Sequence, residues 1–420
     1  MWVGIDDTDA VSGMCTTYLA ALLAEKLGVT GYVRLIRLNP NIPYKTRGNG
    51  ALAFETKTEP KEVKKTVLRY VKEYSRFGSK TTNPGVVFIE NLTPKKKKIL
   101  AEFYHRAVSE LVTIEDAEIV ALSVGAEAHK YKNGRGIIGA LSAIGADLPD
   151  KTYEIIAYRK EKKKEKGIDR ESVIRMDAQT YPETFNNVDY ATGRILITPR
   201  GHDPVFCGIR GNSPEAVEEA WKMIKPYDVI ERTCVFVTNQ GTDAHLRKKK
   251  VKDLRPYDCA ILEGIVVAEP RTMSGGHVFF RFSDGTGTLD CAAYKPTGFF
   301  RDIVKGLVPG DRLRVCGGIS KHPHTLNLEK IEVLVLEKVF LKDAPVCCGK
   351  NMSSAGKGKG LKCKKCGKRT GESVPKEKPR ELILGFYEVP PGARRHLSMP
   401  LMRRRNPSQP IAARPKRTGS

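Results

Sequence analysis

The spacing of apolar runs changes near residue 258, and this change constrains the fold more than any other feature of the sequence. Upstream, strand-like apolar runs alternate with helical patterns such as residues 17–27, which predicts layered α+β structure. Downstream, five short strand-like runs lie close together between turn residues, at 260–268, 278–282, 288–293, 312–317 and 326–336. Five short strands at this spacing predict an OB-fold β-barrel.

The residues before this change divide into two blocks. Strand-like runs mark the first block at 2–5, 33–36, 51–54, 85–89 and 119–124, and the second at 152–157, 194–198 and 233–238. The second block also carries a predicted helix over residues 214–225. Because 420 residues exceed one ordinary core, we predict a multidomain α+β protein. We expect an α/β domain over 1–125, a ferredoxin-like α+β domain over 126–255 and the barrel over 256–340. Periodicity leaves open an arrangement in which the first two blocks interleave.

Four of the ten cysteines fall within twenty residues and predict a zinc ribbon over residues 341–375. Cys363 and Cys366 have a regular zinc-knuckle spacing, whereas Cys347 and Cys348 are adjacent and harder to turn onto one ion. His322 or His324 could therefore take the place of Cys347 or Cys348 as a zinc ligand. The other six cysteines are scattered, and we expect them to be buried thiols.

The charge balance favours a polyanionic partner. The chain has 72 Lys and Arg against 48 Asp and Glu, a formal charge of +24, which suits the phosphates of a nucleic acid. The alternative to a nucleic-acid partner is that these lysines only decorate solvent-exposed faces. The cationic side chains expected to contact RNA are Arg271, Arg281 and Lys295 in the barrel and Lys362, Lys364 and Lys365 in the ribbon.

Aromatic residues in the barrel could stack on bases of single-stranded RNA. Strand alternation places Phe280 and Phe282 on one face and Phe279 and Arg281 on the other. One of these two faces must be core, so only the other set is available for stacking.

The N-terminus lacks the basic and apolar regions of a secretion signal. No apolar run approaches the roughly 18 residues needed to span a membrane. We therefore expect a soluble, cytoplasmic protein that does not enter a membrane.

Three carboxylates directly follow the first predicted strand, at Asp6, Asp7 and Asp9. Carboxylate oxygens in such a cluster are suited to holding Mg²⁺. The next residues, 12–17, include Thr16 and Thr17 and run into a predicted helix, whose N-terminal N–H groups favour phosphate. The alternative is that the acids decorate a turn and a threonine merely caps the helix.

Two further loops suit a phosphate, and both are candidates for ATP binding. The first, residues 43–50, carries Lys45, Arg47, Gly48 and Asn49; the second, 133–139, carries Gly134, Arg135 and Gly136 at the head of a helix. The Walker sequence is absent, so any ATP chemistry is not of the P-loop kind. The G-x-G-x-x-G match in the second loop follows a polar stretch, which argues against an NAD site.

Four motifs together resemble those of the archaeal 2-agmatinylcytidine synthetases. They are Gly4-Ile5-Asp6-Asp7-Thr8-Asp9 with Met14-Cys15-Thr16-Thr17-Tyr18, Ile42-Pro43-Tyr44-Lys45-Thr46-Arg47-Gly48-Asn49-Gly50, Gly201-His202-Asp203-Pro204-Val205, and Thr238-Asn239-Gln240-Gly241-Thr242-Asp243-Ala244-His245. The match spans nearly the whole chain. The resemblance implies attachment of agmatine to C2 of the wobble cytidine of an isoleucine tRNA with a CAU anticodon, which then reads AUA in place of AUG. It also implies that ATP phosphorylates the C2 oxygen before the amine displaces phosphate, leaving AMP and two phosphates.

The resemblance also implies roles for residues of the N-terminal domain, which is kinase-like in this family. Asp6, Asp7 and Asp9 would bind Mg²⁺, and Thr16 matches a threonine that is phosphorylated in family members. Lys45 and Arg47 suit stabilisation of a transferring phosphoryl group. The cofactors expected are ATP, Mg²⁺ and a structural Zn²⁺. The ATP and phosphate contacts are expected at Thr17, Gly48, Asn49, Gly134, Arg135 and Gly136.

Agmatine carries a guanidinium that a carboxylate could clamp, and the candidates are Asp189, Asp203 and Asp243. His202 and His245 are candidate bases for the incoming amine, although a histidine in such a turn often only hydrogen-bonds the backbone. Residues 390–396 resemble the family's tail, so Arg394 and Arg395 in a basic C-terminal tail over 376–420 are expected to contact tRNA. We expect a monomer.

Two other functions fit parts of the sequence. The first is a non-catalytic RNA-binding protein in which the barrel and ribbon bind the RNA and the N-terminal acids are structural. The second is a nuclease or a helicase accessory acting on single-stranded DNA, because a barrel, a ribbon and an acid cluster also occur there. The four family-like motifs argue against this second function.

Overall fold

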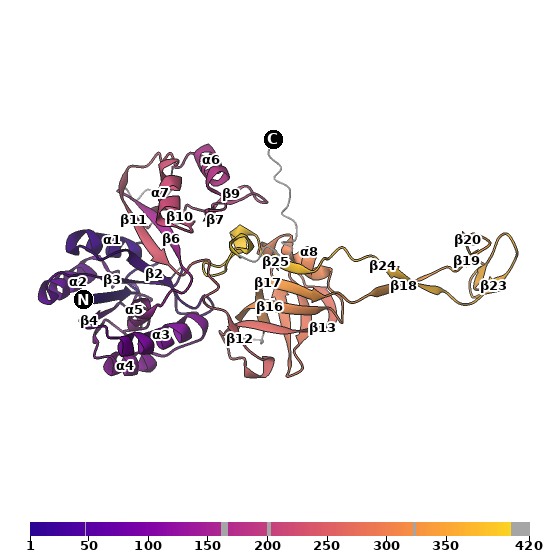
Figure 1. Cartoon of the computed structure of the whole chain (residues 1–420), viewed down its shortest axis with the longest axis horizontal. Helices are drawn as coiled ribbons and strands as arrows, with labels where there is room; N and C mark the ends of the chain where they lie inside the picture. The colour runs from indigo at the N-terminus through magenta and orange to yellow at the C-terminus, as the bar shows by residue number, and fades with distance from the viewer. Residues whose placement is uncertain (47, 161–166, 200–202, 322–324, 405–420) are drawn as a thin grey trace.

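The computed structural model describes residues 1–46, 48–160, 167–199, 203–321 and 325–404. It has a body made of a large sheet and a barrel, from which a thin arm projects (Figure 1). The sheet has nine strands in the order β5-β4-β1-β3-β2-β11-β6-β10-β7.

The first part of the sheet comes from the N-terminal residues. Its strands are β1 (Trp2–Asp6), β2 (Val33–Arg37), β3 (Gly50–Glu55), β4 (Gly85–Ile89) and β5 (Glu127–Lys130). Helices α1 (Thr16–Leu27) and α2 (Pro60–Tyr74) pack on one face, and α3 (Pro94–Ser109), α4 (Ile114–Ser123) and α5 (Gly136–Gly145) pack on the other. Each face has its own apolar core, so this part is a three-layer sandwich.

The second part extends the same sheet. Its strands in the sheet are β6 (Thr152–Arg159), β7 (Thr184–Phe185), β10 (Val205–Gly211) and β11 (Ile230–Thr238), and its helices are α6 (Arg170–Thr180) and α7 (Pro214–Lys222). Strands β8 (Val188–Asp189) and β9 (Arg194–Ile195) pair with each other outside this sheet. Strand β11 runs parallel to β2, with Phe236 beside Val33 and Thr238 beside Leu35. The two parts therefore share one continuous sheet. The domain limits at residues 125, 255, 340 and 375 stay a prediction.

Helix α5 follows residue 125 in the sequence but packs under β1, β3 and β4 of the first part. The contact is close because the helix presents glycines to the sheet. A Cβ on Gly136 would lie 2.9 Å from the carbonyl oxygen of Asn83, and a Cβ on Gly139 would overlap the Asp6 carboxylate. Two glycines of the G-x-G-x-x-G pattern thus serve helix–sheet packing.

The strand predicted at residues 119–124 is wrong, because this segment belongs to α4. Thr113 and Asp116 form a capping box that starts the helix, with the Thr113 hydroxyl accepting a hydrogen bond from the Asp116 N–H at 3.1 Å. Ala117 and Ala121 are buried at helical spacing, whereas Leu122 is exposed. The capping signal therefore outweighs the short apolar run.

The five strands predicted after residue 258 are confirmed and close into a barrel. They are β13 (Cys259–Thr272), β14 (Val278–Ser283), β15 (Thr288–Ala293), β16 (Arg312–Ile319) and β17 (Thr325–Val335), and β13 pairs with β16 to close the ring. Helix α8 (Phe300–Lys305) packs against this barrel. Phe280 and Phe282 are core, whereas Arg281 between them is exposed. As expected from strand alternation, Phe280 and Phe282 share one face of the strand, and the structure shows that this face is the core.

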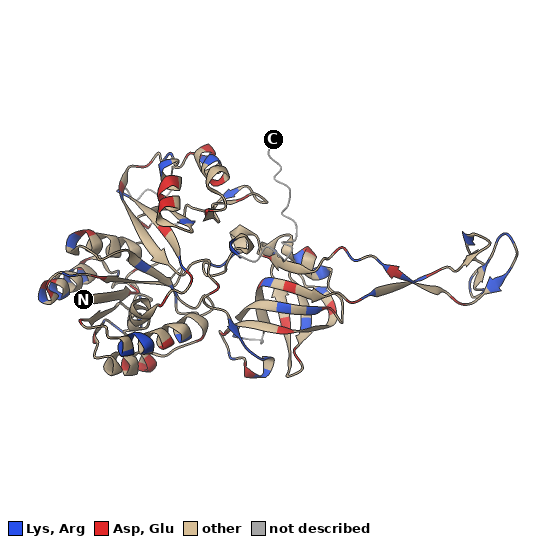
Figure 2. Ribbon diagram, in the orientation of Figure 1, with Lys and Arg blue, Asp and Glu red and all other residues tan. Residues whose placement is uncertain are grey.

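The ribbon is an insertion in the barrel. The chain leaves β17, runs out along β18 (Val339–Asp343), forms the short strands β19 to β23 between residues 346 and 370, and returns along β24 (Val374–Lys378). Strand β25 (Gly385–Glu388) then pairs with β17 on the barrel. Lys and Arg residues gather at the far end of this arm (Figure 2).

The chain after β25 returns to the large sheet. The N–H groups of Gly241 and Asp243 donate to the carbonyl oxygens of His396 and Leu397, both at 2.8 Å. The Leu397 side chain is buried in the core beneath the first part of the sheet. Residues 389–404 therefore tie the barrel to the sheet and are not a loose extension.

A buried ionic group reinforces this junction. Lys330 of β17, 1% exposed, donates to both carboxylate oxygens of Asp243 and to the Met399 carbonyl at 2.7–2.9 Å. His245 lies 3.0 Å from Glu329 of the same strand. Burial raises the pKa of Glu329, but the charges of His245 and its cationic neighbours outweigh it and hold that pKa at about 2.

Candidate active site

A cavity of about 350 Å³ lies where the two parts of the large sheet meet. Most of the residues singled out from the sequence for catalysis, ATP binding or agmatine binding line it. They are Asp6, Asp7, Asp9, Thr16, Thr17, Lys45, Gly48, Asn49, Arg135, Gly136 and Asp203. The motifs are far apart in the sequence, and the fold brings them to one place.

The acidic wall comes from the end of β1. Asp7 has φ +60°, a left-handed conformation that is uncommon for a residue other than glycine, and its carboxylate accepts a hydrogen bond from the Asn83 N–H at 3.0 Å. Burial raises the pKa of Asp6 well above its usual range and that of Asp7 to about 7, and neighbouring acids add to both shifts. The loop thus holds carboxylates together in a site that favours a bound cation.

The two threonines lie at the start of α1. No side chain caps this helix, whose N-cap residue is Cys15. Thr16 and Thr17 are buried, and the Thr16 hydroxyl accepts a hydrogen bond from the Thr8 hydroxyl at 3.1 Å. Thr16 and Thr17 therefore line the cavity beside the acidic loop, at the start of a helix that has no side-chain cap.

The loop over residues 42–50 forms a second wall. The Asn49 amide donates to the Asn39 carbonyl at 2.9 Å, and Lys45 donates to the carbonyl of Pro40. Burial, followed by the charge of Arg395, lowers the pKa of Lys45. Tyr44 stacks against Arg135, whose guanidinium carbon lies 4.0 Å from the ring centre. This contact joins the loop to the head of α5.

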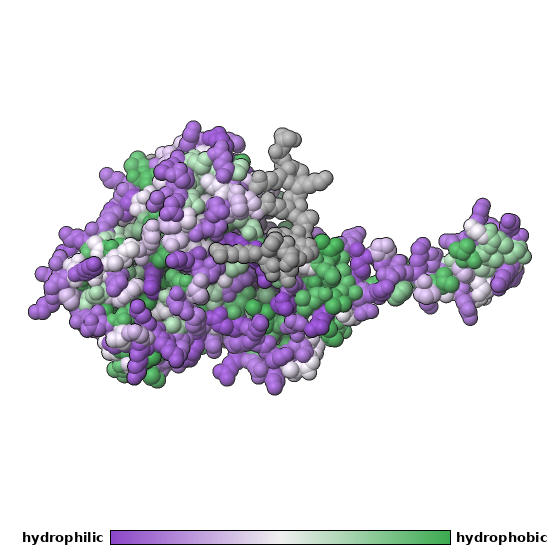
Figure 3. Space-filling model, viewed as in Figure 1, coloured by the Kyte–Doolittle hydropathy of each residue, from purple (hydrophilic) through white to green (hydrophobic). Residues whose placement is uncertain are grey.

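Several predicted residues lie elsewhere. Gly134 packs against Lys130, and Asp189 lines a second, larger groove between residues 177–191, α8 and the tail. Apolar residues gather on the barrel near α8 (Figure 3). Asp243 and His245 are engaged in the ionic group at the junction. Arg47, His202, His322 and His324 lie outside the described residues.

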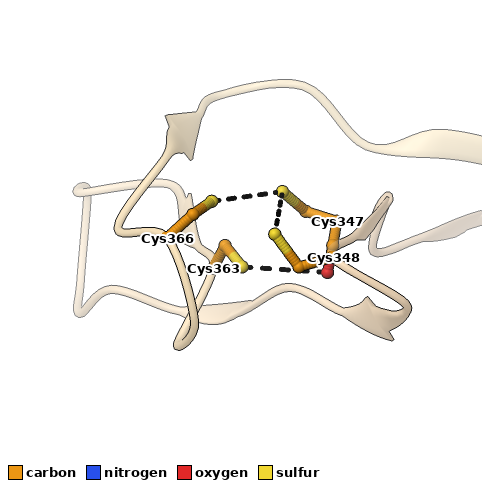
Figure 4. A group of neighbouring side chains, drawn as sticks. All are labelled: Cys347, Cys348, Cys363 and Cys366. Carbon is orange, nitrogen blue, oxygen red and sulfur yellow. Dashed lines mark hydrogen bonds between the residues drawn. The ribbon is translucent and has the colours of Figure 1, made fainter.

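The four cysteines of the ribbon converge at the end of the arm (Figure 4). The sulfur atoms of Cys347, Cys348, Cys363 and Cys366 all lie within 4.8 Å of one another. Four thiolates around one zinc ion would be about 3.8 Å apart, given Zn–S bonds of about 2.3 Å. Cys348 has φ +51°, and this left-handed turn lets the adjacent pair face one point. Hydrogen bonds from the N–H groups of Cys366 and Lys365 lower the pKa of Cys363 to about 6, which favours the thiolate.

Family models match almost the whole chain. They describe a TiaS TCKD domain over residues 2–133, a TiaS FLD domain over 134–245, an OB-fold nucleic acid binding domain over 260–337 and a TiaS C-terminal zinc ribbon domain over 344–382. The isoleucine-tRNA 2-agmatinylcytidine synthetase TiaS of Methanocaldococcus jannaschii is 45% identical over 96% of this chain and 98% of its own length. The chain belongs to the TiaS family.

Two solved structures of the family extend the match to the whole fold. A complex of TiaS with its isoleucine tRNA and ATP is 41% identical, with a TM-score of 0.88 over 98% of this chain and 99% of the other. A complex of TiaS with the same tRNA, AMPCPP and agmatine is 39% identical, with a TM-score of 0.85 over 98% of both chains. The predicted resemblance and the expected combination of α+β domains, OB fold and zinc ribbon are confirmed.

The candidate RNA contacts of this chain fall into two groups. Arg271 and Arg281 both approach Asp290, at 2.9 and 3.5 Å, yet their side chains stay 60% and 45% exposed, and the lysines of the ribbon are exposed as well. Near the tail, Arg394 is 6% exposed and pairs with Glu388 at 2.7 Å. The barrel and ribbon side chains are therefore open to a ligand, whereas Arg394 is engaged at the junction.

Several lining residues were missed from the sequence. Among them are Arg37 at the end of β2, Glu154 of β6, Arg210 of β10 and His396 of the tail. A glutamate within the apolar run 152–157 was a usable signal, because a buried charge needs a partner. His396 gave no such signal. Of the scattered cysteines, Cys207, Cys259, Cys291 and Cys316 are buried as expected, while Cys15 and Cys234 are half-buried.

Among the described residues, every helix is too short or too polar to cross a membrane.

Proposed function

We propose that this chain uses ATP to attach agmatine to C2 of the wobble cytidine of the isoleucine tRNA with a CAU anticodon, so that the tRNA reads AUA. The observation that carries the proposal is the single cavity in which the acidic loop, the α1 N-terminus and the 42–50 loop meet. Its support is family membership and the ligands of the related complexes, which are an isoleucine tRNA, ATP, AMPCPP and agmatine. The reaction takes place in the cytoplasm on a single protein chain.

The chemistry explains why such a cavity is needed. The oxygen on C2 of cytidine is a poor leaving group until ATP phosphorylates it. The primary amine of agmatine then forms the new C–N bond, and the C–O bond breaks as phosphate departs. Thr16, Lys45 and Arg135 lie on the cavity walls where they would bind and orient the phosphates, since fixed cations in a partly buried site stabilise developing negative charge.

Asp6, Asp7 and Asp9 fit a magnesium ion. They supply hard oxygen donors, and burial, followed by the neighbouring acids, raises the pKa values of Asp6 and Asp7, so that a bound cation would favour their charged forms. The ion would neutralise phosphate charge when bound. The protein's own contribution is to hold the three carboxylates on one loop, with Asp7 fixed by Asn83.

Asp203 is the agmatine-binding candidate that the cavity favours. Of the three aspartates considered, Asp203 lines the cavity, whereas Asp243 is paired with Lys330 and Asp189 lies in the second groove. Its carboxylate can accept two parallel hydrogen bonds from a guanidinium. The amine at the other end of agmatine would then reach toward the phosphorylated base.

The barrel and the ribbon would hold the tRNA. A zinc ion bound by Cys347, Cys348, Cys363 and Cys366 would fix the ribbon, and the exposed lysines around it suit a phosphate backbone. Phe279 and Tyr294 lie edge to face on the barrel, with ring centres 6.1 Å apart, and form a small platform for a base. A purely RNA-binding protein would need these modules and would leave the cavity unexplained.

The test is incorporation of labelled agmatine into isoleucine tRNA with a CAU anticodon, in the presence of ATP and Mg²⁺. Asp7→Asn should lower turnover by about 10²–10³-fold, because it removes a carboxylate ligand of the magnesium ion that would neutralise the phosphates, while tRNA affinity is unchanged. The matched control is Asp147→Asn, the same change at an exposed aspartate outside the cavity. If wild-type protein binds the tRNA but incorporates no label, the catalytic assignment fails and RNA binding alone remains.

A further inference from the structure

The cavity contains a cationic group that the proposed roles of the motifs do not use. Arg37 and Arg210 meet at Glu154, whose side chain is only 4% exposed. Arg210 Nε lies 3.1 Å from one carboxylate oxygen of Glu154, and Arg37 Nη2 lies 3.8 Å from the other. One carboxylate thus serves two guanidinium groups, which leaves one positive charge uncompensated in the pair.

Neighbouring side chains fix the two arginines in place. Gln240 donates to the second Glu154 oxygen at 2.5 Å and accepts from Arg37 Nε at 3.3 Å. Arg210 binds Glu154 through Nε, and its terminal nitrogens make no other hydrogen bond within the described residues. Side chains that are ordered before a ligand arrives lose little entropy when they bind it.

His396 joins this group from the tail. Its backbone carbonyl is held by the Gly241 N–H, and its imidazole lines the cavity. Burial, together with the charges of Arg37, Arg210 and Lys45, keeps the pKa of His396 well below its usual range. The neutral ring can still donate one hydrogen bond.

Gly48 keeps the space open. A Cβ at this position would lie 2.5 Å from Arg37 Nη1 and 3.3 Å from His396 Nε2. The backbone at Gly48 does not require a glycine conformation, since its φ is outside the left-handed range. The absence of a side chain therefore matters for the room it leaves to the arginine and the imidazole.

We propose that Arg37, Arg210 and His396 form a subsite for a phosphate group. Paired guanidinium forks match the oxygens of a phosphate, and a neutral imidazole adds a donor without further charge repulsion. Agmatine is excluded from this subsite because both of its ends are cationic. The source of the phosphate rests on the proposed function: it comes from ATP, or it is a backbone phosphate of the tRNA beside the modified nucleotide.

Inorganic phosphate is the probe, added to purified full-length protein without nucleotide and followed by broadening of its ³¹P NMR signal. Arg210→Gln should weaken phosphate binding by about tenfold to a hundredfold, because it removes a charge-assisted contact. Arg175→Gln, at an exposed arginine of α6, is the matched control and should bind phosphate as the wild type does. Equal binding by the wild type and Arg210→Gln, or no binding by either, overturns the subsite.

Gly48→Ala is the second variant, because Arg210→Gln removes a partner of buried Glu154 and could disturb folding. It adds one methyl group and changes no charge, yet it should weaken phosphate binding by displacing Arg37 and His396. A thermal unfolding midpoint close to that of the wild type shows that the fold is kept. Unchanged phosphate binding in a folded Gly48→Ala variant contradicts the geometry proposed.

Two competition experiments identify the source. Displacement of the probe by AMPCPP with Mg²⁺ assigns the subsite to a phosphate of ATP, and displacement by the tRNA alone assigns it to the backbone. Both outcomes support the subsite. Because no step of this test uses agmatine, phosphate binding without agmatine incorporation would retain the subsite while the proposed function failed.

Discussion

The cavity and the zinc ribbon draw their residues from the chain in opposite ways. The cavity takes side chains from β1, α1, the 42–50 loop, β6, β10 and the tail, so residues nearly 400 positions apart line one space. The ribbon takes its four sulfur ligands from a stretch of twenty residues on a two-stranded arm. One site depends on how the whole body is assembled, and the other depends on one local metal cluster.

Because of this difference, substitutions should have different consequences in the two regions. The cavity is held by buried long-range contacts, such as Lys330 with Asp243 and Leu397 in the core below the sheet. The arm is held by the pairing of β18 with β24, and its side chains are largely exposed. Damage to the ribbon should therefore stay local, whereas damage to the junction should reach the chemistry.

Zinc removal is the largest expected effect and tests the independence of the ribbon. Structural zinc ions supply on the order of 10 kcal/mol to the folding of small domains, so a chelator selective for zinc over Mg²⁺ should unfold the ribbon outright. The affinity for tRNA should fall, while binding of ATP and agmatine by the body is unchanged. Calorimetric titration of each ligand before and after chelation measures this. Loss of agmatine binding on chelation would show that the two regions are coupled.

Replacement of Lys330 with Met tests the junction. The change leaves Asp243 without its buried partner, and breaking a buried pair costs about 3 kcal/mol. Urea unfolding should show this loss, and turnover should fall because the tail that carries His396 is anchored through the Met399 carbonyl.

Lys338→Met is the matched control on the arm. Lys338 is 66% exposed and lies 3.1 Å from Glu377, so the loss should be under about 1 kcal/mol with normal turnover. If Lys330→Met and Lys338→Met lower the free energy of unfolding by similar amounts, the contrast between buried and exposed anchoring is refuted.

The sequence predicted best what depends on local pattern. The five barrel strands, the helices at α1 and α7 and the cysteine cluster all follow from periodicity or spacing within a short segment. The error at residues 119–124 came from giving an apolar run more weight than the capping box of Thr113 and Asp116.

Contacts between distant segments could not be predicted from local periodicity or spacing. Periodicity gives no pairing partner for an edge strand, so the parallel pairing of β2 with β11 and the single sheet it creates were not foreseen. For the same reason Arg37, Arg210 and His396 were missed, although the acidic loop and the 42–50 loop were found. The motifs located the cavity, and only the fold completed it.

The smallest predicted effect concerns single lysines of the ribbon. Lys364 is exposed beside Cys363, and its substitution by Ala should leave the fold unchanged because it makes no buried contact. If Lys364 neutralises one tRNA phosphate, the slope of log affinity against log salt should shrink by about 0.7–0.9.

The matched control is Lys61→Ala, at an exposed lysine of α2 far from the arm, which should leave the slope as it is. Equal slopes for both variants would remove Lys364 from the RNA-binding surface. If Lys364→Ala reduces the salt slope by more than the loss of one phosphate contact would, the ribbon binds the tRNA as a cooperative surface. The arm would then be less independent of the body than its thin connection suggests.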